Sequence, residues 1–333
     1  MSARIPTVPP IILPVEDEVR PLWSVMIPAY NCISFLGATL ESVLIQDPGE
    51  AVMQIEVVDD CSTDGDVAAL VKLIGKGRIR YFRQEQNSGS LRNFETCLNR
   101  AKGHWVHLLH GDDRVEKGYY QEIETLFSKH PEAGAAFTNN ALINEKGTVF
   151  YTRDVIAKES GVLANFLLKS AQWPKLEPAA IVVKRSVYEH LGSFYAVHYG
   201  EDWEMWTRIA AHYPVAYSPK NLASYRVLRE GNITQQSYLT SQNVRDMIKV
   251  IDIIQTYLPP EKRKETKNIA LKYYSVHCAK TAIQLYPTEK PAAFMQAKEA
   301  WNMHKNLKSI YFLTKFFINH YTIVFIGFLT WAD

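Results

Sequence analysis

The chain has 333 residues, of which 47% are hydrophobic and 22% charged. This composition is typical of a globular protein and excludes a wholly disordered chain. Lys and Arg number 37 and Asp and Glu 35, so the formal net charge of +2 provides no global argument for a nucleic-acid partner.

The N-terminal residues 1–21 contain five prolines and no basic start followed by an apolar run. They predict an extended arm and not a signal peptide, which favours a cytoplasmic protein. The four cysteines are too far apart in sequence for a CxxC metal or redox motif, and we expect reduced, mostly buried thiols. They are Cys32, Cys61, Cys97 and Cys278.

Strands and helices alternate in the first part of the chain. Short apolar runs predict strands at residues 24–27, 55–58, 79–82 and 105–109. Helical spacing of apolar residues predicts helices at residues 34–46, 67–74 and 91–101. One of Ser62, Thr63 or Asp64 is expected to cap the second of these helices. The alternation predicts an α/β fold with a doubly wound, mostly parallel sheet.

The second part of the chain is less regular. Strands are predicted at residues 135–139, 148–151 and 181–183, and a helix at residues 203–212. Helices then follow one another at residues 244–257, 264–286 and 291–304 and in the aromatic stretch 316–331. The sequence therefore predicts an α/β domain over residues 22–239 and a helical C-terminal region over residues 240–333.

Polar loops follow each of the first four predicted strands. They are residues 28–31, 59–64, 87–93 and 110–113. Ligands bind outside the carboxyl ends of strands in doubly wound sheets, so these loops are expected to meet at one edge. Crowded carboxylates raise one another's pKa unless a cation is present, and adjacent Asp112 and Asp113 suit Mg²⁺ or Mn²⁺.

The other side chains of these loops suit a nucleotide. Asp59 can accept a hydrogen bond from a nucleobase imide, Tyr30 can stack on the base, and Arg92 can neutralise a phosphate. Neither GxGxxG nor GxxxxGK[ST] occurs, which disfavours a nicotinamide-dependent dehydrogenase and a P-loop NTPase. A diphosphate would then be held by metal and arginine.

Five sequence blocks, in this order, resemble the GT-A glycosyltransferases of family 2. They are Val25–Asn31, Val57–Gly65, Asn87–Gly89, Leu108–Asp113 and Gly200–Arg208. The resemblance covers roughly residues 22–234. It implies a GT-A (Rossmann-like), doubly wound mixed sheet with a helical C-terminal extension. It also implies an inverting transfer of sugar from a nucleotide-sugar, usually UDP-linked, to a glycan or lipid-linked glycan, as in the synthesis of a bacterial surface polysaccharide.

The resemblance also implies roles for residues on the donor side. Pro28, Ala29 and Tyr30 would line the base, Asp59 would recognise it, and Arg92 would lie near the nucleotide. Asp112 would bind the divalent metal, Mn²⁺ or Mg²⁺, that bridges the diphosphate, with Asp113 among the substrate-binding residues.

On the acceptor side, Asp202 would be the general base that deprotonates the acceptor hydroxyl. Glu201 would orient or bind the acceptor, and Trp203 would belong to the same substrate-binding group. A single displacement with one base inverts the anomeric centre.

Two positions depart from the family pattern. His110 replaces the first aspartate of the metal motif, and it either ligates the metal or contacts the donor. Leu228 stands where many relatives carry a histidine. Either Arg226 or Arg229 would supply the positive contact to the donor, or the loop of residues 230–234 would close over the donor.

Structural interpretations stay open for several of these residues. Asp59 and Asp60 could form a turn, and Asp202 could serve as a carboxylate at a helix N-terminus. Trp173 could stack on a sugar or lie in the core. A sugar nucleotidyltransferase and a catalytically silent glycan-binding or scaffold protein are the rival functions.

The C-terminal region differs in charge from the rest of the chain. Residues 1–239 carry 24 basic and 28 acidic side chains, a net charge of −4, whereas residues 240–333 carry 13 and 7, a net charge of +6. The apolar stretch 316–331 is shorter than the roughly 20 residues of a spanning helix. It could pack on the α/β domain, form a homo-oligomer, or lie peripherally on a membrane surface.

Overall fold

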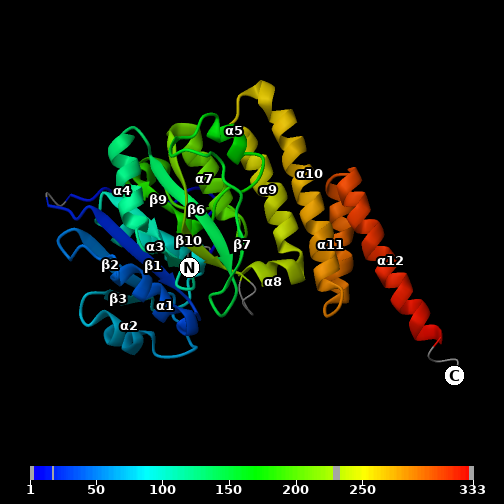
Figure 1. The fold of residues 1–333 in the computed structure, drawn as a ribbon, viewed down its shortest axis with the longest axis horizontal. Helices are drawn as coiled ribbons and strands as arrows, with labels where there is room; N and C mark the ends of the chain where they lie inside the picture. Colours follow the sequence, from blue (N-terminus) through cyan, green and yellow to red (C-terminus); the bar gives the residue numbers. More distant parts are fainter. Residues whose placement is uncertain (1–3, 17–18, 228–232, 330–333) are drawn as a thin grey trace. The chain divides into compact units, whose positions relative to one another are not determined.

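The computed structural model describes residues 4–16, 19–227 and 233–329, with side chains described as far as residue 318. The chain forms two compact units (Figure 1). Unit 1 comprises Met1–Ser170 and Pro174–Arg229, and unit 2 comprises Ala171–Trp173 and Glu230–Asp333. The sequence-based division at residues 239–240 leaves helix α8 (Ile233–Thr240) with the α/β domain. In the structure α8 packs on the C-terminal helices α9 (Gln242–Thr256) and α11 (Lys290–Met303).

Unit 1 is built on a mixed sheet of ten strands in the order β3-β2-β1-β4-β9-β6-β10-β5, with β7 paired to β6 and β8 to β10. The strands are β1 (Trp23–Ala29), β2 (Met53–Asp59), β3 (Arg80–Arg83), β4 (Trp105–Leu108), β5 (Arg114–Val115), β6 (Ala135–Ile143), β7 (Val149–Thr152), β8 (Gly161–Val162), β9 (Ile181–Lys184) and β10 (Val215–Arg226). Strands β3, β2, β1 and β4 are parallel, as predicted, whereas β9 is antiparallel to both its neighbours. The mixed α/β sheet implied by the family resemblance is confirmed.

Helices cover both faces of this sheet. They are α1 (Ile33–Leu44), α2 (Val67–Gly75), α3 (Ser90–Arg100), α4 (Tyr119–Lys129), α5 (Phe166–Ser170), the 3₁₀ helix η1 (Pro178–Ala180), α6 (Arg185–Leu191) and α7 (Glu201–His212). Alternate strand residues enter two separate cores: Val25 and Ile27 of β1 pack with α1, α2 and α4, and Met26 packs with α3, α6 and α7. Burial on both faces explains why these strands read as continuous apolar runs.

Two long elements of unit 1 were not predicted. Helix α4 follows Gly118, whose positive φ of 92° ends the preceding turn. Strand β10 has exposed residues Lys220 and Asn221 in its middle, where its register against β6 shifts. The interruption removes the apolar alternation by which a strand is recognised in a sequence.

The predicted cap of the second helix is wrong. Asp66 caps α2, because its Oδ1 accepts a hydrogen bond of 2.9 Å from the Ala69 backbone N–H. Asp64 instead reaches the first helix, where its Oδ2 accepts from the Ile33 N–H at 2.9 Å. The loops after β1 and β2 lie side by side, so the cap of one helix comes from the loop that precedes the other.

The described part of the N-terminal arm, residues 4–16, contains no helix or strand. The Pro6 and Pro10 carbonyls accept hydrogen bonds of 2.8 Å from the backbone N–H groups of Ala196 and Ser193. Ile12 is 1% exposed and belongs to the core of the α3 face. The arm is therefore an extended segment packed along unit 1.

Unit 2 is helical. Helix α10 (Pro260–Leu285) packs on α9, α11 and α12 (Leu307–Leu329) (Figure 1). Small residues such as Ala279, Ala282 and Ala293 lie in the core of these helices. Trp173 stacks on Tyr273 of α10, with ring centroids 5.6 Å apart. Within the described residues, no helix combines the length and the apolar character needed to cross a membrane.

Candidate active site

The loops after the parallel strands meet at one edge of the sheet. The Asp60 N–H donates to the Ala29 carbonyl at 2.8 Å, and the Gly111 N–H donates to the Pro28 carbonyl at 3.1 Å. A Cβ on Gly111 would lie 2.8 Å from Cys32 Sγ, so this close approach requires glycine. The predicted convergence of polar loops is therefore present.

Three ligand-type side chains gather in the loop after β4. His110, Asp112 and Asp113 each offer one atom that could ligate a metal, and these atoms all lie within 4.8 Å of one another. Thr39 of α1 fixes this loop, because its hydroxyl donates to the Gly111 carbonyl at 3.1 Å and to the Asp113 carbonyl at 2.6 Å. The buried side of α1 thus helps to set the position of the cluster.

Asp113 has an orphaned oxygen. Its side chain is 1% exposed, and its Oδ1 accepts from the Arg226 N–H at 2.8 Å. Its Oδ2 is buried and has no hydrogen-bond partner among the described residues. Burial and the charge of Asp112 raise the pKa of Asp113 well above its usual range. A cation beside Oδ2 would remove this penalty, so the cluster fits a divalent metal with oxygen ligands.

The surroundings of His110 favour its neutral form. Its ring stacks on Phe94 with centroids 5.1 Å apart, and burial lowers its pKa. A neutral imidazole can ligate a metal through a ring nitrogen, whereas an imidazolium cannot. Its place in the cluster agrees with the interpretation of His110 as a ligand, which stays a prediction.

On the predicted nucleotide side, only one of the three residues at the end of β1 is open to solvent. Pro28 and Ala29 are buried within the strand, and Tyr30, the next residue, is 48% exposed. Tyr30 is therefore the side chain of this group whose ring is accessible to a base.

The Asp59 carboxylate is fully buried and already engaged. Its Oδ1 accepts from the Ser62 N–H at 2.9 Å, and its Oδ2 accepts from the Tyr81 hydroxyl at 2.7 Å and from Arg83. These contacts fix the loop after β2 in the way expected of a turn-forming carboxylate. Recognition of a base by Asp59 stays a prediction.

Asp60 joins two of the loops. Its carboxylate accepts from the Ser88 N–H and hydroxyl, both at 2.7 Å, and from the Gly89 N–H at 2.9 Å. Gly89 has a positive φ of 89°, which glycine adopts without strain. Arg92, one turn further along α3, forms an ion pair of 2.6 Å with Glu95.

On the predicted acceptor side, α7 begins after Gly200 with Glu201, Asp202 and Trp203. Asp202 Oδ1 accepts from the Trp203 N–H at 2.7 Å. The Trp203 side chain is 1% exposed, and its indole N–H donates to the Ser170 carbonyl at 2.6 Å. The structure thus places Trp203 in the core, where it anchors the start of the helix, and not on an open substrate surface.

Asp202 has the titration range of a general base. Burial, followed by the negative charge of Glu177, raises the pKa of Asp202 to about 7. Glu177, which the sequence analysis did not select, precedes η1 and forms an ion pair with Arg153. No motif marks Glu177, since its neighbours in space come from distant parts of the chain.

Tyr225 of β10 connects the two sides of the site. Burial raises its pKa, with further increases from four carboxylates: Glu177, Asp113, Asp112 and Asp202. The charges of Asp112, Asp113 and Asp202 therefore all act on one buried phenol. Tyr225 was not predicted as a site residue, although it directly precedes Arg226 in the sequence.

Arg226 is used within the protein. It is 5% exposed, its Nε donates to the Asp112 carbonyl at 2.7 Å, and its Nη1 donates to the carbonyls of Asn144 and Glu145 at 2.6 and 2.8 Å. Arg226 therefore positions the main chain of the loop after β4, which carries Asp112. Contact of Arg226 with a donor stays a prediction, and Leu228, Arg229 and most of the loop 230–234 lie outside the described residues.

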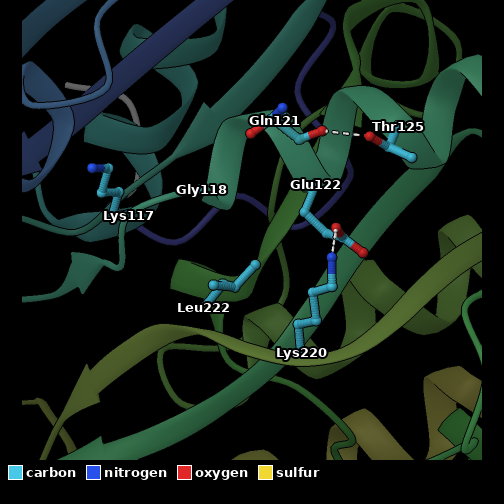
Figure 2. Close-up of a pocket in the computed structure, with 7 residues that line it drawn as sticks. All are labelled: Lys117, Gly118, Gln121, Glu122, Thr125, Lys220 and Leu222. Atoms are coloured by element: carbon cyan, nitrogen blue, oxygen red, sulfur yellow. Dashed lines mark hydrogen bonds and ion pairs between the residues drawn. The ribbon is translucent and has the colours of Figure 1, made fainter.

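A separate hollow of about 380 Å³ contains none of the predicted site residues. It is lined by Lys117, Gly118, Gln121, Glu122, Thr125, Lys220 and Leu222. Figure 2 shows Lys220 directed at Glu122, with the ion pair at 2.6 Å. Glu122 also accepts from the Ser218 hydroxyl at 2.7 Å, so its carboxylate has partners on both sides.

Two relatives illustrate how the chain compares in sequence. The uncharacterized protein MT1568 of Mycobacterium tuberculosis is 30% identical over 247 residues, which cover 71% of this chain and 76% of that protein. TuaG of Bacillus subtilis, named as a teichuronic acid biosynthesis glycosyltransferase, is 33% identical over 131 residues. That match covers 39% of this chain and 50% of TuaG.

Solved structures share the fold. Staphylococcus aureus TarS 1–349 in complex with UDP-GlcNAc matches with a TM-score of 0.61 and 18% identity, over 84% of this chain and 79% of that one. The mannosyltransferase PcManGT of Pyrobaculum calidifontis, in complex with GDP-Man and Mn²⁺, matches with a TM-score of 0.57 and 18% identity. That match covers 98% of this chain and 86% of that one.

The family model described as glycosyl transferase family 2 matches residues 24–191, which include the loops after β1, β2, β3 and β4. Residues 24–191 include His110, Asp112 and Asp113, whereas Asp202 and Tyr225 lie after the matched range. Sheet, loops and family match agree, and the chain belongs to glycosyl transferase family 2.

Proposed function

We propose that this glycosyltransferase moves a sugar from a UDP-sugar to a hydroxyl of a glycan or lipid-linked glycan, with inversion. The observation that carries the proposal is the group of His110, Asp112 and Asp113 at the sheet edge where the loops after β1, β2 and β4 meet. TarS is described in complex with UDP-GlcNAc, and TuaG is named for teichuronic acid biosynthesis. These names support a nucleotide-sugar donor and a role in bacterial surface polysaccharide synthesis. We place this role on the cytoplasmic side of the cell as part of the same proposal.

Asp112 and Asp113, with His110, would hold Mn²⁺ or Mg²⁺. When bound, such a cation neutralises the charge that grows on a departing diphosphate. The buried, unpartnered Asp113 Oδ2 supports this assignment. PcManGT, which has the same fold, is described in complex with Mn²⁺.

Asp202 would accept the proton of the attacking hydroxyl. A base is most effective when its pKa lies near the working pH, and a pKa of about 7 meets that condition. Glu201, which precedes it on α7, would orient the acceptor. The sugar needs no covalent attachment to the protein in a direct displacement, and the single displacement inverts its anomeric centre.

Tyr30 would stack on the base at the end of β1, beside Pro28 and Ala29. For Asp59, Arg92 and Arg226 the proposal requires a change of partner, because each already has an acidic, polar or main-chain partner in the structure. On donor binding, the contact that Asp59, Arg92 or Arg226 makes within the protein would be replaced by a contact with the donor.

A thermal-shift panel tests the donor and the metal together. UDP-glucose, UDP-galactose, UDP-GlcNAc and GDP-mannose are each added with Mn²⁺, with Mg²⁺ or with EDTA. We expect stabilisation by one UDP-sugar in the presence of metal and none with EDTA. Stabilisation by GDP-mannose alone would contradict the UDP assignment, and equal stabilisation with EDTA would contradict the metal assignment.

The product distinguishes the remaining functions. A glycosyltransferase releases UDP from the UDP-sugar when an acceptor hydroxyl is present. Pyrophosphate release from UTP and a sugar phosphate would instead establish a nucleotidyltransferase. Donor binding without turnover on any glycan acceptor would support the silent glycan-binding function.

A further inference from the structure

Helix α12 leaves an apolar face uncovered. Leu307, Tyr311 and Ile318 are 87%, 62% and 58% exposed. With Thr314 they follow the i, i+4, i+7, i+11 spacing that places side chains on one side of a helix. Ile310 and Phe317, 39% and 42% exposed, border the same stripe.

The opposite side of α12 belongs to the core of unit 2. Leu313 and Phe316 are 5% and 1% exposed and pack with residues of α10 and α11. Phe316 makes edge contacts with Tyr286 and Phe294, at centroid distances of 5.4 and 5.2 Å. The exposed stripe is thus the outer face of a helix whose inner face is already packed.

Lysines accompany this stripe. Residues 290–318 contain five lysines and one acidic residue, Glu299. Lys308 and Lys315 lie seven residues apart on α12, beside the apolar positions, and both are exposed. On the adjoining segment, Lys305 lies over the exposed ring of Trp301 at 4.9 Å. Exposed aromatic and apolar side chains bordered by lysine are typical of helices that lie in a membrane interface.

We infer that the outer face of α12, together with Trp301 and Lys305, binds an anionic lipid surface, with the helix lying in the plane of the interface. Apolar side chains would enter the boundary between head groups and acyl chains, and the lysines would pair with phosphate groups. The sequence of α12 beyond residue 318 continues in mainly apolar residues to Leu329. The inference does not depend on which sugar the enzyme transfers.

Charge argues for a lipid surface over a second copy of the chain. A symmetric dimer through this face would bring Lys305, Lys308 and Lys315 against the same lysines of the second copy. Like charges placed opposite one another oppose association, whereas an anionic surface complements them. The apolar stripe alone would suit either a lipid surface or a second copy of the chain. The lysines beside it favour the lipid surface.

Co-sedimentation of the full chain with vesicles tests the inference. We expect binding to an equimolar mixture of phosphatidylcholine and phosphatidylglycerol, little binding to phosphatidylcholine alone, and weakening at high salt. Each lysine near an anionic surface contributes about a fivefold gain in binding. The variant K305Q/K308Q/K315Q should therefore bind about 100-fold more weakly than the parent.

Matched variants distinguish binding through this face of α12 from nonspecific binding to vesicles. L307S/Y311S/I318S should lose vesicle binding, whereas I45S/L73S, at residues 70% and 72% exposed on unit 1, should keep it. K72Q/K129Q, two exposed lysines of unit 1, should also keep it. Circular dichroism confirms that each variant is folded.

Three outcomes would overturn the inference. They are equal binding to vesicles without phosphatidylglycerol, retained binding by either α12 variant, and no binding by a parent chain that forms dimers in light scattering. The last would assign the face to a second copy. None of these outcomes bears on donor binding, which the thermal-shift panel measures separately.

Discussion

The two units of this glycosyltransferase differ in the unsatisfied group that each presents. Unit 1 buries Asp113, whose Oδ2 has no hydrogen-bond partner among the described residues. Unit 2 leaves large apolar side chains such as Leu307 and Tyr311 along one face of α12. Burying a charge costs free energy unless a partner is present, and exposing a large apolar stripe costs free energy unless something covers it. The two features motivate the two proposals, a cation for unit 1 and a lipid surface for unit 2.

The proposed sugar transfer takes place on unit 1, so Asp202→Asn should have the largest effect on activity. The amide cannot accept the acceptor proton, so we expect kcat to fall about 100- to 10,000-fold while the affinity for UDP stays nearly unchanged. Steady-state kinetics and calorimetric titration of UDP measure the two effects. The matched control is Asp252→Asn, an exposed carboxylate of unit 2 paired with Lys267 at 2.6 Å, which should retain full activity. An equal loss of UDP affinity in Asp202→Asn would contradict its assignment as the base.

Asp112→Ala tests whether the carboxylates of Asp112 and Asp113 bind a cation. Removing one ligand should abolish the stabilisation that metal adds to donor binding and lower kcat/KM by about 100-fold or more. Thermal shifts with UDP-sugar, recorded with and without Mn²⁺, give the readout. If Asp112→Ala keeps the metal-dependent shift, the cluster of His110, Asp112 and Asp113 is not the metal site.

Asp60→Ala measures how far buried charge also supports the fold of unit 1. Three hydrogen bonds from Ser88 and Gly89 lose their acceptor, so we expect a loss of about 2–3 kcal/mol in the free energy of unfolding. Urea denaturation provides the measurement. Asp252→Ala on the surface of unit 2 should change it by less than about 1 kcal/mol. Similar losses in both variants would remove the contrast between the units.

Glu177→Gln tests the electrostatics of the acceptor side through pH. After burial, the charge of Glu177 is the largest cause that raises the pKa of Asp202 to about 7, and Arg153 opposes it. Removing that negative charge lowers the pKa of Asp202, so the rising limb of kcat/KM should move to lower pH, by about one unit or less. The exposed Glu124→Gln should leave the profile in place. An unchanged or upward-shifted limb in Glu177→Gln would show that Glu177 does not act on the base.

Leu307→Ser should have the smallest effect. A side chain 87% exposed contributes little to the core, so the free energy of unfolding should change by about 0.5 kcal/mol or less. Thermal and urea unfolding without lipid measure it. A loss above 2 kcal/mol would show that Leu307 is a packing residue, and the uncovered face of α12 would then be part of the fold.

Much of unit 1 was predictable because its signals are local. The strands and helices up to β4 follow from short apolar runs and helical spacing, and the polar loops follow directly after them. Helix α4 and strand β10 were missed, and for β10 the reason is that Lys220 and Asn221 interrupt its pattern. Trp203 was placed among the substrate-binding residues because it follows Asp202 in sequence. The structure buries it, since adjacent residues of a helix point about 100° apart.

The sequence by itself determined the family, the mixed α/β fold class and the position of the His110–Asp113 loop, because motifs and periodicity are read from neighbouring residues. The tertiary structure decided which groups act on one another. Residues 113, 177, 202 and 225 are far apart in the chain, and only the folded sheet brings them to one site. Burial and those neighbours raise the pKa values of Asp113 and Asp202, and neither can be read from a local pattern.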